Sequence, residues 1–136
     1  MKVIFNCKHY DFHRDYCLNI HNELLKRGYE SIISTNEEWY EDADFTIQPD
    51  EACKRQGGLG IWINHAFPFI PHNKFYLEED FIKDITNHSD YIFTFSEAWV
   101  EWHKHYNLPI EVVGMPKLDN LFDVEKENTV ILYAPT

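Results

Sequence analysis

A histidine at the predicted end of a buried strand is the residue of this chain best placed to do chemistry. The stretch GIWINHAFP starts at Gly60, and its apolar run, residues 61–63, leads directly into Asn64 and His65. In open parallel α/β sheets, ligands bind in the crevice outside the carboxyl ends of the strands. A histidine with a pKa of about 6.5 can act there as a general base and take a proton from an attacking hydroxyl. The alternative role for His65 is structural, a hydrogen bond to the backbone that caps the strand.

Cysteine and histidine side chains near the amino terminus form a second candidate group, with the chemistry of a zinc site. They are Cys7, His9, His13, Cys17 and His21. The last three recur every four residues on a predicted helix, but the set matches no standard zinc spacing. Cys17 also shares a helix face with Ile20 and Leu24, which is typical of a small core residue. We therefore expect no metal at this group, and a zinc ion is the alternative.

Two turns after later predicted strands suit an anion. Ser96 follows the strand at residues 91–95, and as the N-cap of the next helix it would leave backbone amides for a phosphate. The turn GMPKLD after the strand at residues 110–113 contains Gly114, Pro116, Lys117 and Asp119. Lys117 can meet a phosphate or pair with Asp119 at the surface. The sequence contains no glycine-rich nucleotide motif, no GxSxG and no HExxH.

The elements that would hold these residues form a parallel sheet. The chain opens with a strand, a helix and a strand at residues 2–6, 13–27 and 29–34, and Gly28 ends the helix. This order is the right-handed unit of a parallel sheet. Further strands are predicted at 44–47, 61–63, 91–95 and 110–113, and further helices at 50–56, 77–87 and 96–106. We expect an α/β fold, a Rossmann-like parallel sheet of about six strands with helices on both faces.

A seventh strand is predicted at residues 129–133, close to the last residue, Thr136. A buried strand with no following helix to cover it rarely ends a domain. We therefore expect residues 1–122 to form one Rossmann-like domain. Residues 123–136 would then be the connector and the first strand of a second domain.

The composition is typical of a globular protein from a reducing compartment. Hydrophobic residues make up 44% of the chain, and three cysteines at irregular spacing form no disulfide framework. The formal charge of −11 argues against nucleic acid as a partner, because phosphate backbones require a basic surface. No apolar run reaches the roughly 20 residues of a membrane span, and the first residues do not resemble a signal peptide. We expect a cytoplasmic protein.

Three segments, taken in order, resemble the CDP-glycerol glycerophosphotransferase family, the teichoic-acid polymerases and primases of Gram-positive cell walls. GIWINHAFP, from Gly60, resembles the apolar strand that leads to W-H-G-T-P in that family. SDYIFTFSEAW, from Ser89, resembles its D-Y-x-x-x-x-S strand and helix start. IEVVGMPKLDNLF, from Ile110, resembles its G-x-P-R-x-D-x-L-F turn, and the closing VILYAPT resembles its I-L-Y-A-P-T. The resemblance covers residues 60–136.

The resemblance implies the N-terminal, acceptor-side half of a GT-B enzyme, in which two Rossmann-like halves enclose the active site. His65 would be the catalytic base. It would deprotonate a terminal glycerol hydroxyl of a cell-wall polymer, which attacks the β-phosphate of CDP-glycerol and releases CMP. The substrate-binding residues implied in this half are Asn64, Ser96, Gly114, Pro116, Lys117 and Asp119.

The partners implied are a nucleotide-activated donor, a polyol or sugar-phosphate acceptor, and the C-terminal domain. That domain would bind the donor, either CDP-glycerol or a nucleotide sugar, and no further cofactor is implied. The family works at the cytoplasmic face of the cell membrane, which implies peripheral contact with that face.

Two other classes of protein fit the same pattern of elements. One is another GT-B enzyme, such as a glycosyltransferase or a non-hydrolysing nucleotide-sugar epimerase. The other is a non-enzymatic α/β domain of the flavodoxin or receiver type, which would bind a partner through its acidic face.

Overall fold

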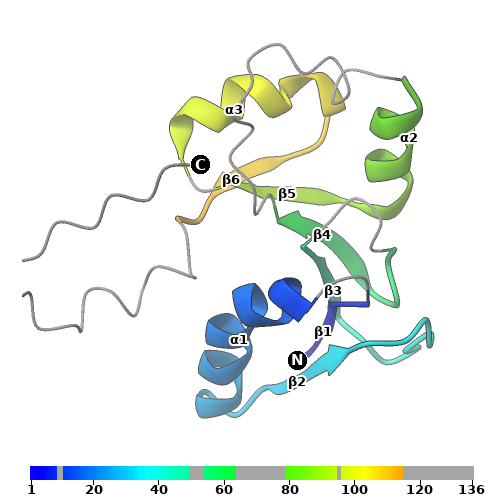
Figure 1. Cartoon of the computed structure of the whole chain (residues 1–136), viewed down its shortest axis with the longest axis vertical. Coiled ribbons are helices and arrows are strands. Elements are labelled where there is room, and N and C mark those ends of the chain that lie inside the picture. The colour runs from blue at the N-terminus through cyan, green and yellow to red at the C-terminus, as the bar shows by residue number, and fades with distance from the viewer. Residues whose placement is uncertain (9–10, 50–53, 64–78, 95, 115–136) are drawn as a thin grey trace, which may run out of the picture.

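Six parallel strands form a sheet in the described part of this computed structural model, which comprises residues 1–8, 11–49, 54–63, 79–94 and 96–114 (Figure 1). The sheet order is β2-β1-β3-β4-β5-β6, and every neighbouring pair is parallel. The strands are β1 (Lys2–Asn6), β2 (Glu30–Ser34), β3 (Phe45–Gln48), β4 (Leu59–Ile63), β5 (Tyr91–Thr94) and β6 (Ile110–Val112). The helices are α1 (Asp11–Lys26), α2 (Glu79–His88), α3 (Glu97–His103) and the 3₁₀ turn η2 (Lys104–Tyr106). The predicted α/β, Rossmann-like arrangement is confirmed.

Helix α1 covers one face of the first strands. Successive side chains of a strand point to opposite faces, and Val3 and Phe5 of β1 belong to the buried cluster on the α1 side. Cys17 is fully buried in that cluster, and Ile20 and Leu24 of α1 pack against it. The helix face predicted from the spacing of these three residues is therefore confirmed.

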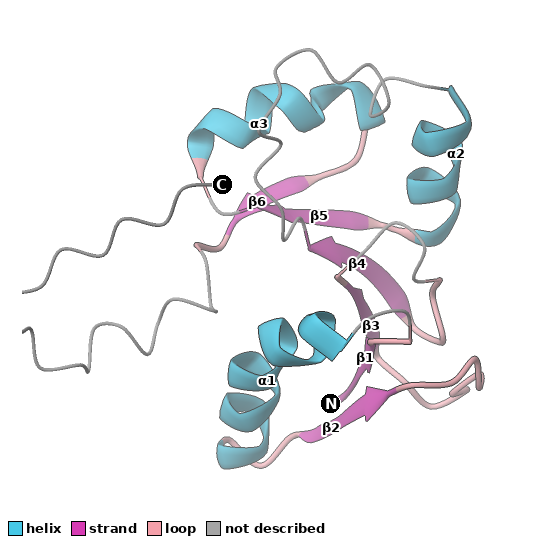
Figure 2. Cartoon of the chain, in the orientation of Figure 1, coloured by secondary structure: helices cyan, strands magenta, loops and turns pink. Residues whose placement is uncertain are grey.

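Helix α2 covers the opposite face over β4 and β5 (Figure 2), and Tyr106 of η2 belongs to the same buried cluster. Trp62 lies between Ile61 and Ile63 in sequence, but these two neighbours belong to the α1 side and Trp62 does not. Its indole contacts the rings of Phe81 and Tyr106 edge-on, with centroids 6.4 Å and 5.5 Å away. Helices therefore lie on both faces, as the sequence predicts.

The connection between β2 and β3 is a loop, and residues 35–44 form no helix. Two side-chain hydrogen bonds hold the loop that leads to β4. Gln56 donates from Nε2 to the carbonyl of Asn36, in the β2–β3 loop, at 2.6 Å. Thr46 of β3 donates from Oγ1 to the Gly57 carbonyl at 2.6 Å. The predicted helix at residues 50–56 is wrong for its described part, residues 54–56, which is irregular. Long-range hydrogen bonds hold that backbone instead.

The ends of the other elements lie close to their predicted positions. Helix α1 ends at Lys26, and Gly28 follows with a φ of 78°, which favours glycine. Helix α3 passes into one 3₁₀ turn, after which Asn107 adopts a φ of 55°. The predicted strand at residues 129–133 and the domain at 123–136 lie outside the described residues. None of the helices in the described ranges has the length and apolar character that crossing a membrane requires.

Candidate functional site

The carboxyl ends of β4, β5 and β6 are neighbours at one edge of the sheet. Ile63 pairs with Phe93, and Thr94 pairs with Val112, so the three strands end almost level. The segments that follow them are the three for which the sequence predicts function. Ser96 lies two residues beyond β5, and Gly114 lies two residues beyond β6. We call this part of the sheet the β4–β6 edge.

Two of the seven predicted site residues, Ser96 and Gly114, lie within the described part of the chain, and both are at the β4–β6 edge. The other five lie outside the described residues: Asn64, His65, Pro116, Lys117 and Asp119. Asn64 and His65 follow Ile63, the last residue of β4, directly in sequence. The roles of these five residues therefore remain predictions.

Ser96 occupies the N-cap position of α3 but does not cap it through its side chain. Its backbone is extended, with φ −157° and ψ 160°, and its hydroxyl makes no capping hydrogen bond. The Ser96 carbonyl instead accepts a hydrogen bond from the Trp99 amide at 3.0 Å. The position predicted for Ser96 is confirmed, and the side-chain cap is wrong. Its half-buried hydroxyl is not used to satisfy the helix.

Gly114 ends the β6 segment with a φ of 78°, a conformation that a side chain would strain. The preceding residue, Val113, still donates its amide to the Thr94 carbonyl at 2.8 Å. The chain therefore leaves the sheet at Gly114, as the sequence predicts. A Cβ atom added there would meet no other atom of the described residues within 4 Å.

Two buried polar atoms beneath the β4–β6 edge have no hydrogen-bond partner among the described residues. They are Oγ1 of Thr94, the last residue of β5, and Nε1 of Trp62 in β4. Thr94 is 1% exposed and Trp62 is 4% exposed. Neither was among the predicted site residues. The alternation in YIFTF puts Thr94 on the same buried face as Ile92, and a hydroxyl at such a position is the signal that could have singled it out.

His103 is a buried titratable group on the same side of the sheet. Its Nδ1 lies 2.7 Å from the Trp99 carbonyl, and its ring contacts Trp62 edge-on with the centroids 5.5 Å apart. Burial lowers the pKa of His103 below its ordinary value of 6.5, and the hydrogen bond to Trp99 opposes that shift only in part. Burial within an aromatic cluster therefore favours the neutral form of this imidazole. His103 lies four residues after Trp99, so the two share one face of the helix, and this spacing is the sequence signal for its buried position.

The crevice where strand order reverses lies elsewhere, between β1 and β3. In open α/β sheets this switch point is the usual ligand site. At this switch point the polar side chains are hydrogen-bonded to other parts of the chain. Asn6 donates from Nδ2 to the Lys54 carbonyl at 2.8 Å, and its Oδ1 accepts from the Lys8 amide at 3.2 Å. Gln48, at the end of β3, donates to the His88 carbonyl at 2.8 Å and accepts from the Ser89 hydroxyl at 2.9 Å. Among the described residues, the buried polar atoms left without a partner are Nε1 of Trp62 in β4, Oγ1 of Thr94 at the end of β5, and Oε1 of Gln56 in the loop before β4.

The candidate zinc ligands that can be described serve other roles. Cys7 and Cys17 are buried in the core on the α1 side, and His21 lies with its Nδ1 2.8 Å from the Ser31 hydroxyl. His9 lies outside the described residues. Within the described ranges, no group of three or more His, Cys, Asp or Glu side chains is arranged to hold a metal ion.

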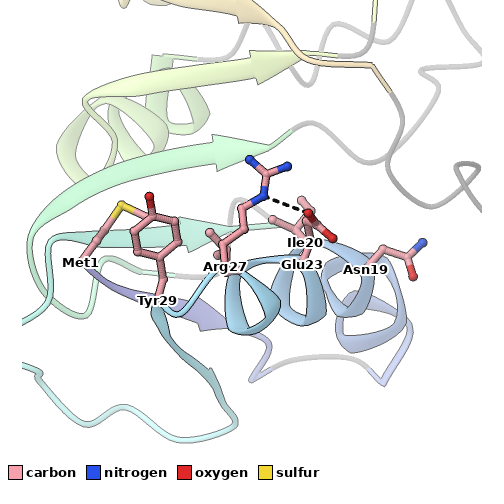
Figure 3. Close-up of a pocket in the computed structure, with 7 residues that line it drawn as sticks. Met1, Asn19, Ile20, Glu23, Arg27 and Tyr29 are labelled. Atoms are coloured by element: carbon pink, nitrogen blue, oxygen red, sulfur yellow. Dashed lines mark hydrogen bonds and ion pairs between the residues drawn. The ribbon is translucent and has the colours of Figure 1, made fainter.

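A pocket of about 400 Å³ lies on the flank of α1, at the opposite edge of the sheet (Figure 3). Its wall includes the apolar side chains of Ile20 and Leu24, and Met1 and Tyr29 lie just before the amino ends of β1 and β2. Its charged members, Glu23 and Arg27, pair with each other at 2.8 Å. It is therefore separate from the β4–β6 edge and offers no free charge to it.

The acidic residue of the SDYIFTF segment has a structural role. One carboxylate oxygen of Asp90 accepts from the Gly60 amide and from Nη1 of Arg55, both at 2.8 Å. The Asp90 amide in turn donates to the Gly60 carbonyl at 2.7 Å. These bonds join the start of β5 to β4 at the amino edge. Asp90 therefore fixes the position of the strand that leads to His65.

Comparisons of the chain with protein-family models, with curated proteins and with solved structures found no match. The geometry of the β4–β6 edge is therefore the basis on which its function is proposed.

Proposed function

We propose that the chain is the acceptor-side half of a GT-B transferase that moves glycerol phosphate from CDP-glycerol to a hydroxyl of a cell-wall polymer. The observation that carries the proposal is the adjacency of β4, β5 and β6. The three segments that resemble the glycerophosphotransferases each follow one of these strands. Segments separated by many residues in sequence therefore start from one edge of the sheet, as a common substrate site requires.

His65 is the general base in this proposal. It takes the proton from the terminal hydroxyl of the acceptor, and that oxygen attacks the β-phosphate of CDP-glycerol as CMP leaves. Phosphoryl transfer depends on alignment and charge stabilisation more than on covalent help from the protein. One positioned base on the acceptor side, together with donors to the phosphate, is therefore sufficient machinery.

The remaining site residues bind the acceptor. Ser96 contributes a hydroxyl that its helix does not use, and Gly114 leaves room for a ligand to approach the backbone. Lys117 contributes a cation for the acceptor phosphate, while Asn64, Pro116 and Asp119 complete the set by the family resemblance. The donor nucleotide belongs to a second half of the enzyme, and the work is done at the cytoplasmic face of the membrane.

The proposal is tested by titrating the isotope-labelled chain with an oligomer of glycerol phosphate and following the backbone amide resonances. Saturable shifts are expected at Ser96 and Gly114. Gly28 is the internal control, because its φ of 78° equals that of Gly114 but it lies at the other edge of the sheet. Lys117→Ala should weaken binding about tenfold, or about 1.4 kcal/mol. Lys26→Ala, on the exposed end of α1, should not change it.

The absence of saturable shifts, or equal shifts at Gly28 and Gly114, would contradict the proposal. Addition of CDP-glycerol to the chain and the oligomer should release no CMP, because the donor site is assigned to the second half. Release of CMP by these residues alone would overturn that assignment.

A non-enzymatic binding domain is the second candidate function. The order β2-β1-β3-β4-β5 is that of flavodoxin-like sheets, whose ligand lies at the β1/β3 switch point. The same titration distinguishes the two, because a ligand at the switch point would shift Asn6 and Asn36 and leave Gly114 unchanged.

A further inference from the structure

Cys7 and Cys17 lie together in the core on the α1 side of the sheet. Cys7 directly follows β1 and is 4% exposed, and Cys17 lies on α1 and is 0% exposed. Both belong to one buried cluster, and Cys17 lies near enough to Cys7 to lower the pKa of its thiol. Both are present as thiols. Two neighbouring thiols in one buried cluster are the arrangement from which a disulfide can form.

The surroundings of Cys7 make it the more reactive member of the pair. The hydrogen bond from Cys17 and the positive charge of Arg14 lower the pKa of Cys7, and together they outweigh burial, which raises it. The thiolate is the form that attacks an oxidant. The backbone around Cys7 is also held in place, because its amide donates to the Ser34 carbonyl at 2.8 Å. Cys7 is thus the attacking sulfur, and Cys17 is positioned to resolve the product.

We propose that Cys7 and Cys17 form a redox-sensitive dithiol that closes to an intramolecular disulfide with a small hydroperoxide as the oxidant. In the first step the Cys7 thiolate attacks the peroxide and the O–O bond breaks. After protonation the products are the sulfenic acid and an alcohol, which is water when the oxidant is hydrogen peroxide. In the second step the Cys17 sulfur attacks the Cys7 sulfur, and the hydroxyl leaves as water. Two thiols are oxidised, one hydroperoxide is reduced, and the new bond ties α1 to the end of β1.

Burial sets the kind of oxidant that can react. Bulky thiol reagents should label neither residue in the folded chain, whereas hydrogen peroxide is small enough to enter during brief opening of the first turns of α1. The disulfide should then reduce the exchange of the α1 amides with solvent, because the helix can no longer leave β1.

The test is mild treatment of the folded chain with hydrogen peroxide, followed by digestion with trypsin and mass spectrometry. Trypsin cleaves after Lys8 and Arg14, so Cys7 and Cys17 fall in different peptides and a crosslink between them is diagnostic. We expect that crosslinked peptide as the main product, with the mass of two hydrogens lost and restored by a thiol reductant. The Cys53→Ser variant should give the same product in the same yield.

Two further samples keep the proposal falsifiable. In concentrated guanidinium the preference for Cys7–Cys17 should disappear, because the native contact is lost. In the Cys17→Ala variant, Cys7 should stop at a sulfenic acid, which dimedone traps once the oxidised chain is unfolded in guanidinium. Disulfides made mainly through Cys53, or folded chain with both thiols intact after Cys53 has been fully oxidised, would overturn the proposal.

Discussion

The Oγ1 atom of Thr46 lies 2.6 Å from the carbonyl oxygen of Gly57 and 3.1 Å from the amide nitrogen of Gln56. One fully buried hydroxyl therefore donates to one backbone group and accepts from another. These groups belong to the loop that leads to β4, where a helix was predicted. The Thr46 hydroxyl thus gives the Gln56 amide and the Gly57 carbonyl the hydrogen bonds that backbone partners would give them in a helix.

Replacement of Thr46 by valine should therefore be costly. Valine keeps the shape of threonine but leaves the Gln56 amide and the Gly57 carbonyl without their partner in the protein interior. We expect the free energy of unfolding to fall by about 3 kcal/mol, measured by urea denaturation. The matched control is Thr94→Val, since Thr94 is equally buried but its Oγ1 has no partner within the described part of the chain. That change should leave stability the same or raise it by about 1 kcal/mol. Equal losses in the two variants would contradict this account.

His103 should make the stability of the fold depend on pH. Burial lowers the pKa of His103 in the folded chain, whereas the unfolded chain keeps the ordinary value of 6.5. The unfolded state therefore takes up the proton first as the pH falls. The free energy of unfolding should be constant above that value and fall below it, down to the pKa of the folded state.

The variant that tests this is His103→Phe, which keeps an aromatic ring beside Trp62 and Tyr106. Its unfolding free energy, measured by urea denaturation from about pH 8 to about pH 5, should change less with pH than that of the parent chain. The slope should be reduced rather than abolished, because burial also lowers the pKa of His21. Parallel curves for the two proteins over the whole range would show that His103 does not contribute.

Much of this fold follows from local patterns, and what was missed depends on contacts distant in sequence. The alternation in KVIFN and the spacing of Cys17, Ile20 and Leu24 are sufficient to predict β1 and the buried face of α1. The irregular backbone at residues 54–56 could not be predicted in this way, because a side chain 48 residues earlier, Asn6, holds the Lys54 carbonyl. Local composition favours a helix there, and the tertiary hydrogen bonds outweigh it.

The candidate site also has one part that follows from local sequence patterns and another part that depends on distant contacts. The positions of Ser96 and Gly114 follow from the ends of two strongly patterned strands, so they could be predicted from the sequence. The alternation in YIFTF predicts that the Thr94 hydroxyl is buried, but its lack of a partner among the described residues could not be predicted, because it depends on every neighbouring side chain at once. His65 and Lys117 were selected by their places after predicted strands, and the family resemblance supplied their roles, which remain predictions.

Gly60, in β4, should tolerate no side chain. A Cβ atom added there would clash with the carbonyl oxygen of His88, a backbone atom that cannot turn aside. Gly60→Ala should therefore lower the free energy of unfolding by about 3 kcal/mol, because strand and helix end must separate. Gly114→Ala is the comparison: space is open there, and only the φ of 78° opposes the change, at about 1 kcal/mol. If Gly114→Ala proves the more harmful of the two in thermal or urea unfolding, the clash is not what excludes a side chain.

Asp90 should stabilise the strand pair β4 and β5 through both its charge and its hydrogen bonds. One of its carboxylate oxygens accepts hydrogen bonds from the Gly60 amide and the Arg55 guanidinium, at 2.8 Å each. The side chains of Asp90 and Arg55 are both partly exposed. Asp90→Ala removes both contacts and should lower the free energy of unfolding by about 2 kcal/mol. Asp90→Asn keeps an oxygen for the Gly60 amide and loses only the charge, which at a solvent-accessible site is worth about 0.5 kcal/mol. The loss in the alanine variant should persist at high salt, whereas the smaller loss in the asparagine variant should shrink, because salt screens the ion pair and not the backbone hydrogen bond. If the two variants lose the same stability in low salt, the ion pair with Arg55, and not the bond to Gly60, holds this end of the sheet.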